Sequence, residues 1–204
     1  MNITDIIIPE ELQDITLPTP EELNYWYLRG QRTYWIDYEI EDDYRLIELS
    51  KEIVRINEEE RNVKNPKPII LYIYSYGGDI EQANFFCDLL LSSHVPIITV
   101  ATGVAMSAGL LIFLAGKRRY AFPHTQLLIH SGSAAFSGTS DQLEQVQKSY
   151  KKQIDAMKEY ILERTNIDEK LFNKQRNKDW YVSGDEIIDL GLADKFITDF
   201  NEIK

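Results

Sequence analysis

The chain has almost no cysteine, which excludes a disulfide framework. Cys87 is the single cysteine among 204 residues, so no disulfide can form within the chain. Cys87 falls in an apolar helical pattern, which favours a small buried residue over a reactive thiol. Residues 1–5 also lack the basic and apolar regions of a secretory signal. Because proteins without disulfides are typical of reducing compartments, we expect a cytoplasmic location.

Glycine, proline and basic residues are also scarce. The chain has 10 glycines and 7 prolines, while 44% of its residues are hydrophobic, which excludes collagen-like, low-complexity and wholly disordered proteins. Its 33 acidic and 22 basic side chains give a net charge of −11. We therefore expect neither nucleic acid nor an anionic membrane as a partner. The acidity is concentrated in residues 1–64, which have 16 acidic and 7 basic side chains.

Charged side chains are absent from residues 89–116, a run of 28 residues that is long enough to span a bilayer. Polar and small residues interrupt the run, however, including Pro96, Thr99 and Gly103. The run also divides into a β-branched piece at residues 97–100 and a helical piece at residues 110–114. We interpret it as a strand, a turn and a helix buried at the centre of an α/β domain.

Strand-like and helix-like segments alternate along most of the chain. After an acidic, proline-containing extension over residues 1–30, we expect strands at residues 32–37, 69–74, 96–101, 120–122 and 126–129, and helices at 46–56, 79–91 and 107–115. A turn is expected between the strand that ends at 101 and the helix that begins at 107. This alternation predicts an α/β fold with parallel strands.

A long helix is predicted over residues 140–164, after a loop of small residues at 131–138. Its apolar residues recur every three or four positions and form one stripe: Leu143, Val146, Tyr150, Ile154, Met157 and Ile161. From the residues alone, the stripe could pack on the chain's own sheet or form a subunit interface.

Two segments could take part in chemistry because each joins a strand to a helix. Gly77 and Gly78 allow positive φ angles and expose backbone N–H groups to an anion, although Gly-Gly alone is most often a tight turn. Ser107 lies among small residues at a helix N-terminus, where it could be a nucleophile or simply an N-cap. His130 ends an apolar strand beside the flexible loop, which makes it a better general base than His94 or His124. Scattered histidines make no metal site, and no acidic partner can be chosen from 33 candidates.

Six motifs occur in order along the chain and resemble the proteolytic subunits of the Clp protease family. The motifs are YIYSYGG, GVAMSAG, GKR, LIH, KDWYVS and GLAD, at residues 72–78, 103–109, 116–118, 128–130, 178–183 and 191–194. The resemblance covers residues 32–198. It implies a crotonase-like fold in one catalytic domain at residues 32–204, with a protruding handle helix at about 139–164 and a divergent acidic extension at 1–31.

The same resemblance implies a serine endopeptidase that hydrolyses unfolded polypeptides through an acyl-enzyme. Ser107 matches the family's nucleophile, His130 its general base and Asp179 the aspartate of its triad. The backbone N–H groups of Gly78 and Ala108 match the oxyanion hole. No metal or organic cofactor is implied.

Family resemblance further implies a homo-oligomer of two stacked heptameric rings, a tetradecamer, and a possible AAA+ Clp unfoldase as partner. The chain could also be a divergent or phage-type member of the family. Two alternatives remain open at this point. The chain could be an inactive or scaffolding paralogue, or a crotonase-fold enzyme that acts on acyl-CoA.

Overall fold

The computed structural model describes residues 17–41 and 44–203. The chain divides into two compact units, Met1–Thr33 and Tyr34–Lys204. The described part of the first unit holds helix α2 (Pro20–Gly30), which begins with a capping box between Thr19 and Glu22. No residue of α2 is buried. Most of the expected extension lies outside the described residues, so the boundary between residues 31 and 32 stays a prediction.

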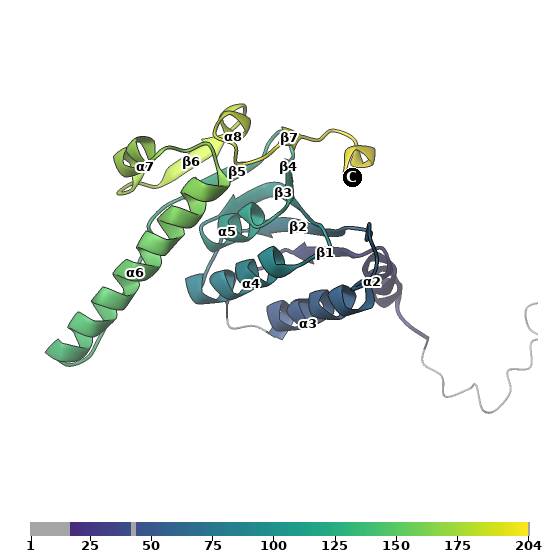
Figure 1. Cartoon of the computed structure of the whole chain (residues 1–204), viewed down its shortest axis with the longest axis horizontal. Coiled ribbons are helices and arrows are strands. Elements are labelled where there is room, and N and C mark those ends of the chain that lie inside the picture. The colour runs from purple at the N-terminus through teal and green to yellow at the C-terminus, as the bar shows by residue number, and fades with distance from the viewer. Residues whose placement is uncertain (1–16, 42–43, 204) are drawn as a thin grey trace, which may run out of the picture. The chain divides into compact units, whose positions relative to one another are not determined.

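The second unit is built on a seven-stranded sheet (Figure 1). Its strands are β1 (Thr33–Ile36), β2 (Ile69–Ser75), β3 (Ile97–Met106), β4 (Arg118–Ala121), β5 (Gln126–Ile129), β6 (Trp180–Ser183) and β7 (Lys195–Phe196). The main order is β1-β2-β3-β4-β7, while β5 pairs with β3 and β6 pairs with β5. Strand pairs β2–β3, β3–β4, β3–β5 and β4–β7 are parallel, as the alternation of elements predicts, and β5–β6 is antiparallel.

The expected turn after residue 101 is wrong, because β3 continues to Met106. The first half of β3 pairs with β4 as far as Ala101, and residues Val104 to Met106 pair instead with β5. Gly103, with φ +75°, lies where the partner strand changes. The second set of backbone hydrogen bonds keeps the chain extended across a glycine that, in the sequence, is typical of a turn.

Helix α4 (Ile80–Ser92) packs against both α3 (Tyr44–Glu59) and α5 (Ala108–Leu114), and α3 and α4 lie below the sheet in Figure 1. Every residue of α5 is buried, so it forms the centre of the core. The uncharged run at 89–116 is thus divided among the end of α4, β3 and α5. Among the described helices, none is both long and apolar enough to cross a membrane.

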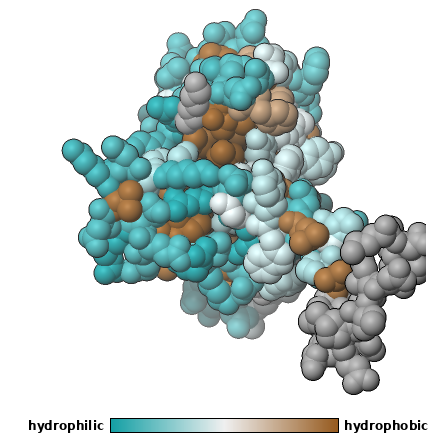
Figure 2. All heavy atoms as spheres, turned by 90° about the vertical axis from the view of Figure 1, so that its right-hand side faces the viewer, coloured by the Kyte–Doolittle hydropathy of each residue, from teal (hydrophilic) through white to brown (hydrophobic). Residues whose placement is uncertain are grey.

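Apolar side chains also pack on the other side of the sheet. Tyr72, Val100 and Tyr120 belong to a second, smaller cluster that includes Ile98 and Ile197. The face of the molecule in Figure 2 shows hydrophobic atoms in small patches separated by polar side chains.

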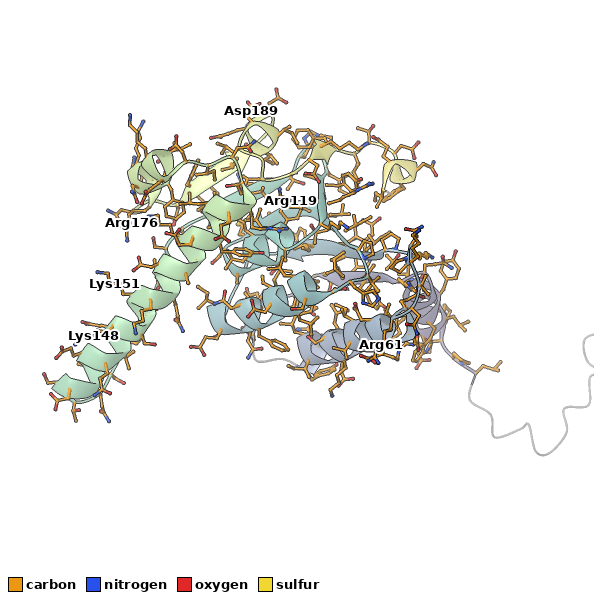
Figure 3. All side chains as sticks on the ribbon, in the orientation of Figure 1. Arg61, Arg119, Lys148, Lys151, Arg176 and Asp189 are labelled. Carbon is orange, nitrogen blue, oxygen red and sulfur yellow. The ribbon has the colours of Figure 1, made fainter. Side chains whose placement is uncertain are left out.

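Helix α6 (Ser140–Arg164) extends away from the sheet at its N-terminal end (Figure 1). Its C-terminal half is fastened to α5 and the turn after it: Tyr160 donates a hydrogen bond to Leu111 O (3.1 Å), and Arg164 Nε donates one to Leu114 O (2.9 Å). The buried residues of α6, Met157 and Ile161, belong to the same half. Lys148 and Lys151 are among the polar residues on the projecting half (Figure 3).

Three short elements complete the second unit. They are α7 (Glu169–Gln175), α8 (Glu186–Asp189) and the 3-10 helix η2 (Phe200–Glu202). The chain leaves α7 at Arg176 and reaches β6 four residues later.

Candidate active site

The turn after β2 brings backbone unusually close to two other segments. Gly77 and Gly78 both have φ angles in the left-handed region, +109° and +141°. A Cβ at Gly77 would lie 2.7 Å from both Ser107 Cβ and Met106 O, and a Cβ at Gly78 would overlap the carbonyl of Ile40. Only glycine satisfies both the φ angles and the space, so this Gly-Gly pair is more than an ordinary turn.

Ser107 connects β3 to α5 in a strained backbone conformation. Its φ and ψ angles are +52° and −122°. Among the described non-glycine residues, only Ser107 and Arg32 have a positive φ angle. The Ser107 amide N–H donates to Leu128 O at 3.0 Å, which joins the end of β3 to β5. The side chain makes no capping hydrogen bond to α5. Ser107 therefore occupies the N-cap position of α5 without capping the helix through its side chain. Backbone strain of this kind is concentrated at functional sites.

Three side chains from different parts of the chain meet beside this turn. Ser107 Oγ lies 2.8 Å from His130 Nε2, and His130 Nδ1 lies 3.4 Å from Asp179 Oδ1. His130 follows β5 and Asp179 precedes β6, and the antiparallel pairing of Ile129 with Trp180 brings them together. The His130 side chain is 26% exposed and that of Asp179 is 61% exposed. The order of contacts, hydroxyl to imidazole to carboxylate, is that of a nucleophile, a base and an orienting group.

Two backbone N–H groups lie next to the serine. The hydrogen bonds among the described residues include none from the amides of Gly78 and Ala108. Ala108 is the first residue of α5, so its N–H is one of the donors that a helix N-terminus leaves unpaired. Gly78 and Ala108 also line the same cavity as Ser107 and His130. Unpaired donors beside a nucleophile can stabilise an anion that forms there.

The cavity in front of Ser107 has a volume of about 550 Å³. One wall is the loop after His130, the opposite one is the start of α4, and α6 contributes Tyr150, Gln153, Ile154 and Met157. Gln153 donates to Glu81 Oε1 at 2.7 Å, which links α6 to α4 across this space. The cavity is large enough to receive side chains of a peptide.

The other two histidines lie elsewhere. His94 precedes β3 and its Nε2 is 3.1 Å from Glu60 O, and His124 is in the turn before β5. No cluster of metal-ligating side chains is present in the described residues. Sequence reasoning overlooked two neighbours of the triad, Ser131 and Tyr150. Tyr150 O–H donates to Ser131 O at 3.1 Å, a contact between distant segments that no local pattern indicates.

Comparisons with known proteins point to one family. The family described as Clp protease matches residues 32–200. The ATP-dependent Clp protease proteolytic subunit 2 of Treponema denticola is 30% identical over 158 residues, which are 76% of this chain and 79% of that protein. The ATP-dependent Clp protease proteolytic subunit of Deinococcus radiodurans is 29% identical over 142 residues, or 68% of this chain and 70% of that protein.

A solved structure has the same fold. A point mutant of ClpP1 from Listeria monocytogenes superposes with a TM-score of 0.76 at 24% identity, covering 89% of this chain and 99% of that one. The family match and the relatives define a serine peptidase, and the fold is of mixed α/β architecture. The chain belongs to the Clp protease family. The predicted resemblance, the crotonase-like fold and the enzyme class are thereby confirmed.

Proposed function

We propose that Ser107, His130 and Asp179 hydrolyse peptide bonds as a catalytic triad. The observation that carries this proposal is the 2.8 Å separation between Ser107 Oγ and His130 Nε2. At this distance His130 accepts the hydroxyl proton as Ser107 Oγ attacks the carbonyl carbon of the substrate. Asp179 holds the imidazole with Nε2 toward the serine and stabilises the imidazolium that forms.

The N–H groups of Gly78 and Ala108 then stabilise the oxyanion of the tetrahedral intermediate. His130 returns the proton to the leaving amine, the C–N bond breaks and an acyl-enzyme on Ser107 remains. Water then attacks the ester while His130 takes its proton; the bond between the acyl carbon and Ser107 Oγ breaks, and His130 returns the proton to Oγ as the acid product leaves. These steps need neither a metal nor an organic cofactor, because the proton acceptor, the nucleophile and the anion donors are all groups of this chain.

The proposed substrates are unfolded polypeptides. The cavity lies between the loop at 131–138 and α4, and an extended peptide could lie along the loop as an added strand. The relatives are named as subunits of ATP-dependent proteases, which supports an AAA+ Clp unfoldase as the partner that supplies unfolded chains. A cytoplasmic location fits such a partnership.

The proposed assembly is a tetradecamer of two stacked heptameric rings. Its support is the projecting half of α6, where Val146 is 40% exposed and Leu143 is only half-buried. Both belong to the apolar stripe, and within the second unit they are not buried as Met157 and Ile161 are. An apolar stripe on a projecting helix is stabilised when a second subunit covers it.

Hydrolysis of an unfolded protein by the wild type and by Ser107→Ala tests this function. The wild type should release peptides, whereas the variant should release none and keep its assembled mass. An assembled wild type without hydrolysis would favour a scaffolding paralogue, and turnover of acyl-CoA would favour a crotonase-type enzyme. Equal hydrolysis by both proteins would refute the role of Ser107.

A further inference from the structure

The His130–Asp179 pair lies just beyond the end of a strand ladder. The last pair of β5 and β6 is Ile129 with Trp180, and His130 and Asp179 are the next residues on the two strands. Asp179 is 61% exposed, and its carboxylate contacts His130 at 3.4 Å. An exposed carboxylate at this distance is held chiefly by the path of its own backbone. The segment from Arg176 to Asp179 therefore decides where the carboxylate lies.

One side chain fastens that segment to the strand that bears the histidine. Ser131, directly after His130, donates from Oγ to Arg176 O at 2.7 Å. Arg176 is the C-cap of α7, and the Lys178 amide donates to Gln175 O at 2.9 Å, so the turn continues to the residue before Asp179. The Ile129–Trp180 pair and the Ser131–Arg176 bond thus enclose the His130–Asp179 pair from both sides.

Ser131 has a second bond on its other side. Its carbonyl accepts from Tyr150 O–H of α6 at 3.1 Å, and the Tyr150 ring packs edge-on against Phe136 of the loop, with 5.5 Å between ring centroids. The backbone of Ser131 is therefore held by α6 while its hydroxyl holds the end of α7. A residue fixed in this way can transmit the position of one segment to another.

We propose that Ser131 is a positioning residue that keeps Asp179 aligned with His130. This inference rests on the proposed function, because Ser131 acts only through the His130–Asp179 pair. Ser131→Ala should lower kcat for a short fluorogenic peptide roughly 3- to 10-fold, the range expected for one lost neutral hydrogen bond. KM should stay within about twofold, since the hydroxyl that is removed bonds to Arg176 O and the other residues that line the cavity are unchanged. Ser131→Thr keeps a hydroxyl and should restore the wild-type rate.

The decisive comparison repeats the substitution in an Asp179→Asn background. If Ser131 acts by positioning the Asp179 carboxylate, Ser131→Ala should not lower kcat any further in a protein that already has Asp179→Asn. A general loss of stability would instead lower the rate by the same factor in both backgrounds. Ser137→Ala is the matched control, because it also removes a hydroxyl from the loop at 131–138. The Ser137 hydroxyl makes no hydrogen bond to any of the described residues.

The outcomes separate the two proposals. A wild-type rate for Ser131→Ala, or an equal loss in both backgrounds, would overturn the role of Ser131 and leave the triad standing. Wild-type protein that neither hydrolyses the peptide nor reacts with a fluorophosphonate would overturn the proposed function and this inference with it. A loss in the wild-type background alone, with rescue by threonine, is the result expected.

Discussion

Ser107 Oγ lies 2.8 Å from His130 Nε2 although the two residues are 23 positions apart. The contact depends on the sheet, because Ser107 N–H donates to Leu128 O and so holds the end of β3 against β5. This bond joins Ser107 to Leu128, which is two residues before His130. In the proposed mechanism, this arrangement places the serine hydroxyl and its base for proton transfer before any substrate binds.

Removal of the carboxylate should weaken this base strongly. Asp179→Asn should reduce kcat/KM roughly 10³-fold, less than the roughly 10⁴-fold known for a buried triad aspartate, because Asp179 is 61% exposed. The asparagine amide can favour the wrong imidazole tautomer. Asp185→Asn, at another exposed aspartate, should leave the rate unchanged. Steady-state hydrolysis of a fluorogenic peptide measures both, and equal rates would exclude Asp179 from the triad.

A side chain at Gly78 should damage the oxyanion site. Gly78→Ala places a Cβ against the Ile40 carbonyl, so the turn must move and its N–H with it. We expect kcat to fall roughly 10²- to 10³-fold, the usual effect of one lost oxyanion donor. Gly184→Ala is the control, since Gly184 also has positive φ (+59°) but has open space around it. If both variants lost activity equally, backbone strain rather than the displaced N–H would explain the result.

A charge on the apolar stripe of α6 should prevent assembly. Val146→Asp would bury a carboxylate in the proposed interface, which is costly when the charge is unpaired. Sedimentation should show a smaller particle, while the circular dichroism of the subunit stays the same. Gln147→Asp, one position along the exposed part of the helix, should assemble normally. An undiminished mass for Val146→Asp would place the interface elsewhere.

The single thiol should be inert in the folded protein. Burial raises the pKa of Cys87 to about 12. The folded thiol therefore keeps its proton to higher pH than the unfolded thiol, whose pKa is about 8.5. Its contribution to stability is present below about pH 8.5 and declines as the pH rises toward about 12. Iodoacetamide at about pH 8 should alkylate Cys87 only after unfolding, as intact mass would show, and rapid alkylation of the native protein would contradict this burial.

The sequence predicted those parts of the fold whose local pattern and tertiary environment agree. The helix at residues 140–164 and strand β2 follow from apolar periodicity and from the breaks around them. The pattern predicts too short a strand at β3, because the last residues of β3 pair with β5, which comes later in the chain. This pairing outweighs the preference of Gly103 for a turn. Such pairing is tertiary and leaves no local signal.

The candidate site also combines residues that have a local sequence signal with residues that have none. Ser107 and His130 could be proposed from their places at the ends of apolar strands, but physics alone could not select Asp179 from 33 acidic residues. Its selection depends on the β5–β6 pairing, and β6 is only 4 residues long. The resemblance to a family supplied what periodicity could not. Neither the periodicity nor the resemblance could predict the hydrogen bond from Ser131 to Arg176, because it joins two segments that are distant in the sequence.

The most direct test of the account is covalent labelling of the serine. The wild-type protein, incubated with a fluorophosphonate, should gain one adduct per chain, and peptide mapping should locate it on Ser107. Ser107→Ala and His130→Ala should gain none under the same conditions, because one lacks the nucleophile and the other its base. An adduct on another residue, or labelling of Ser107→Ala at the wild-type rate, would contradict the central claim that Ser107 is the activated nucleophile.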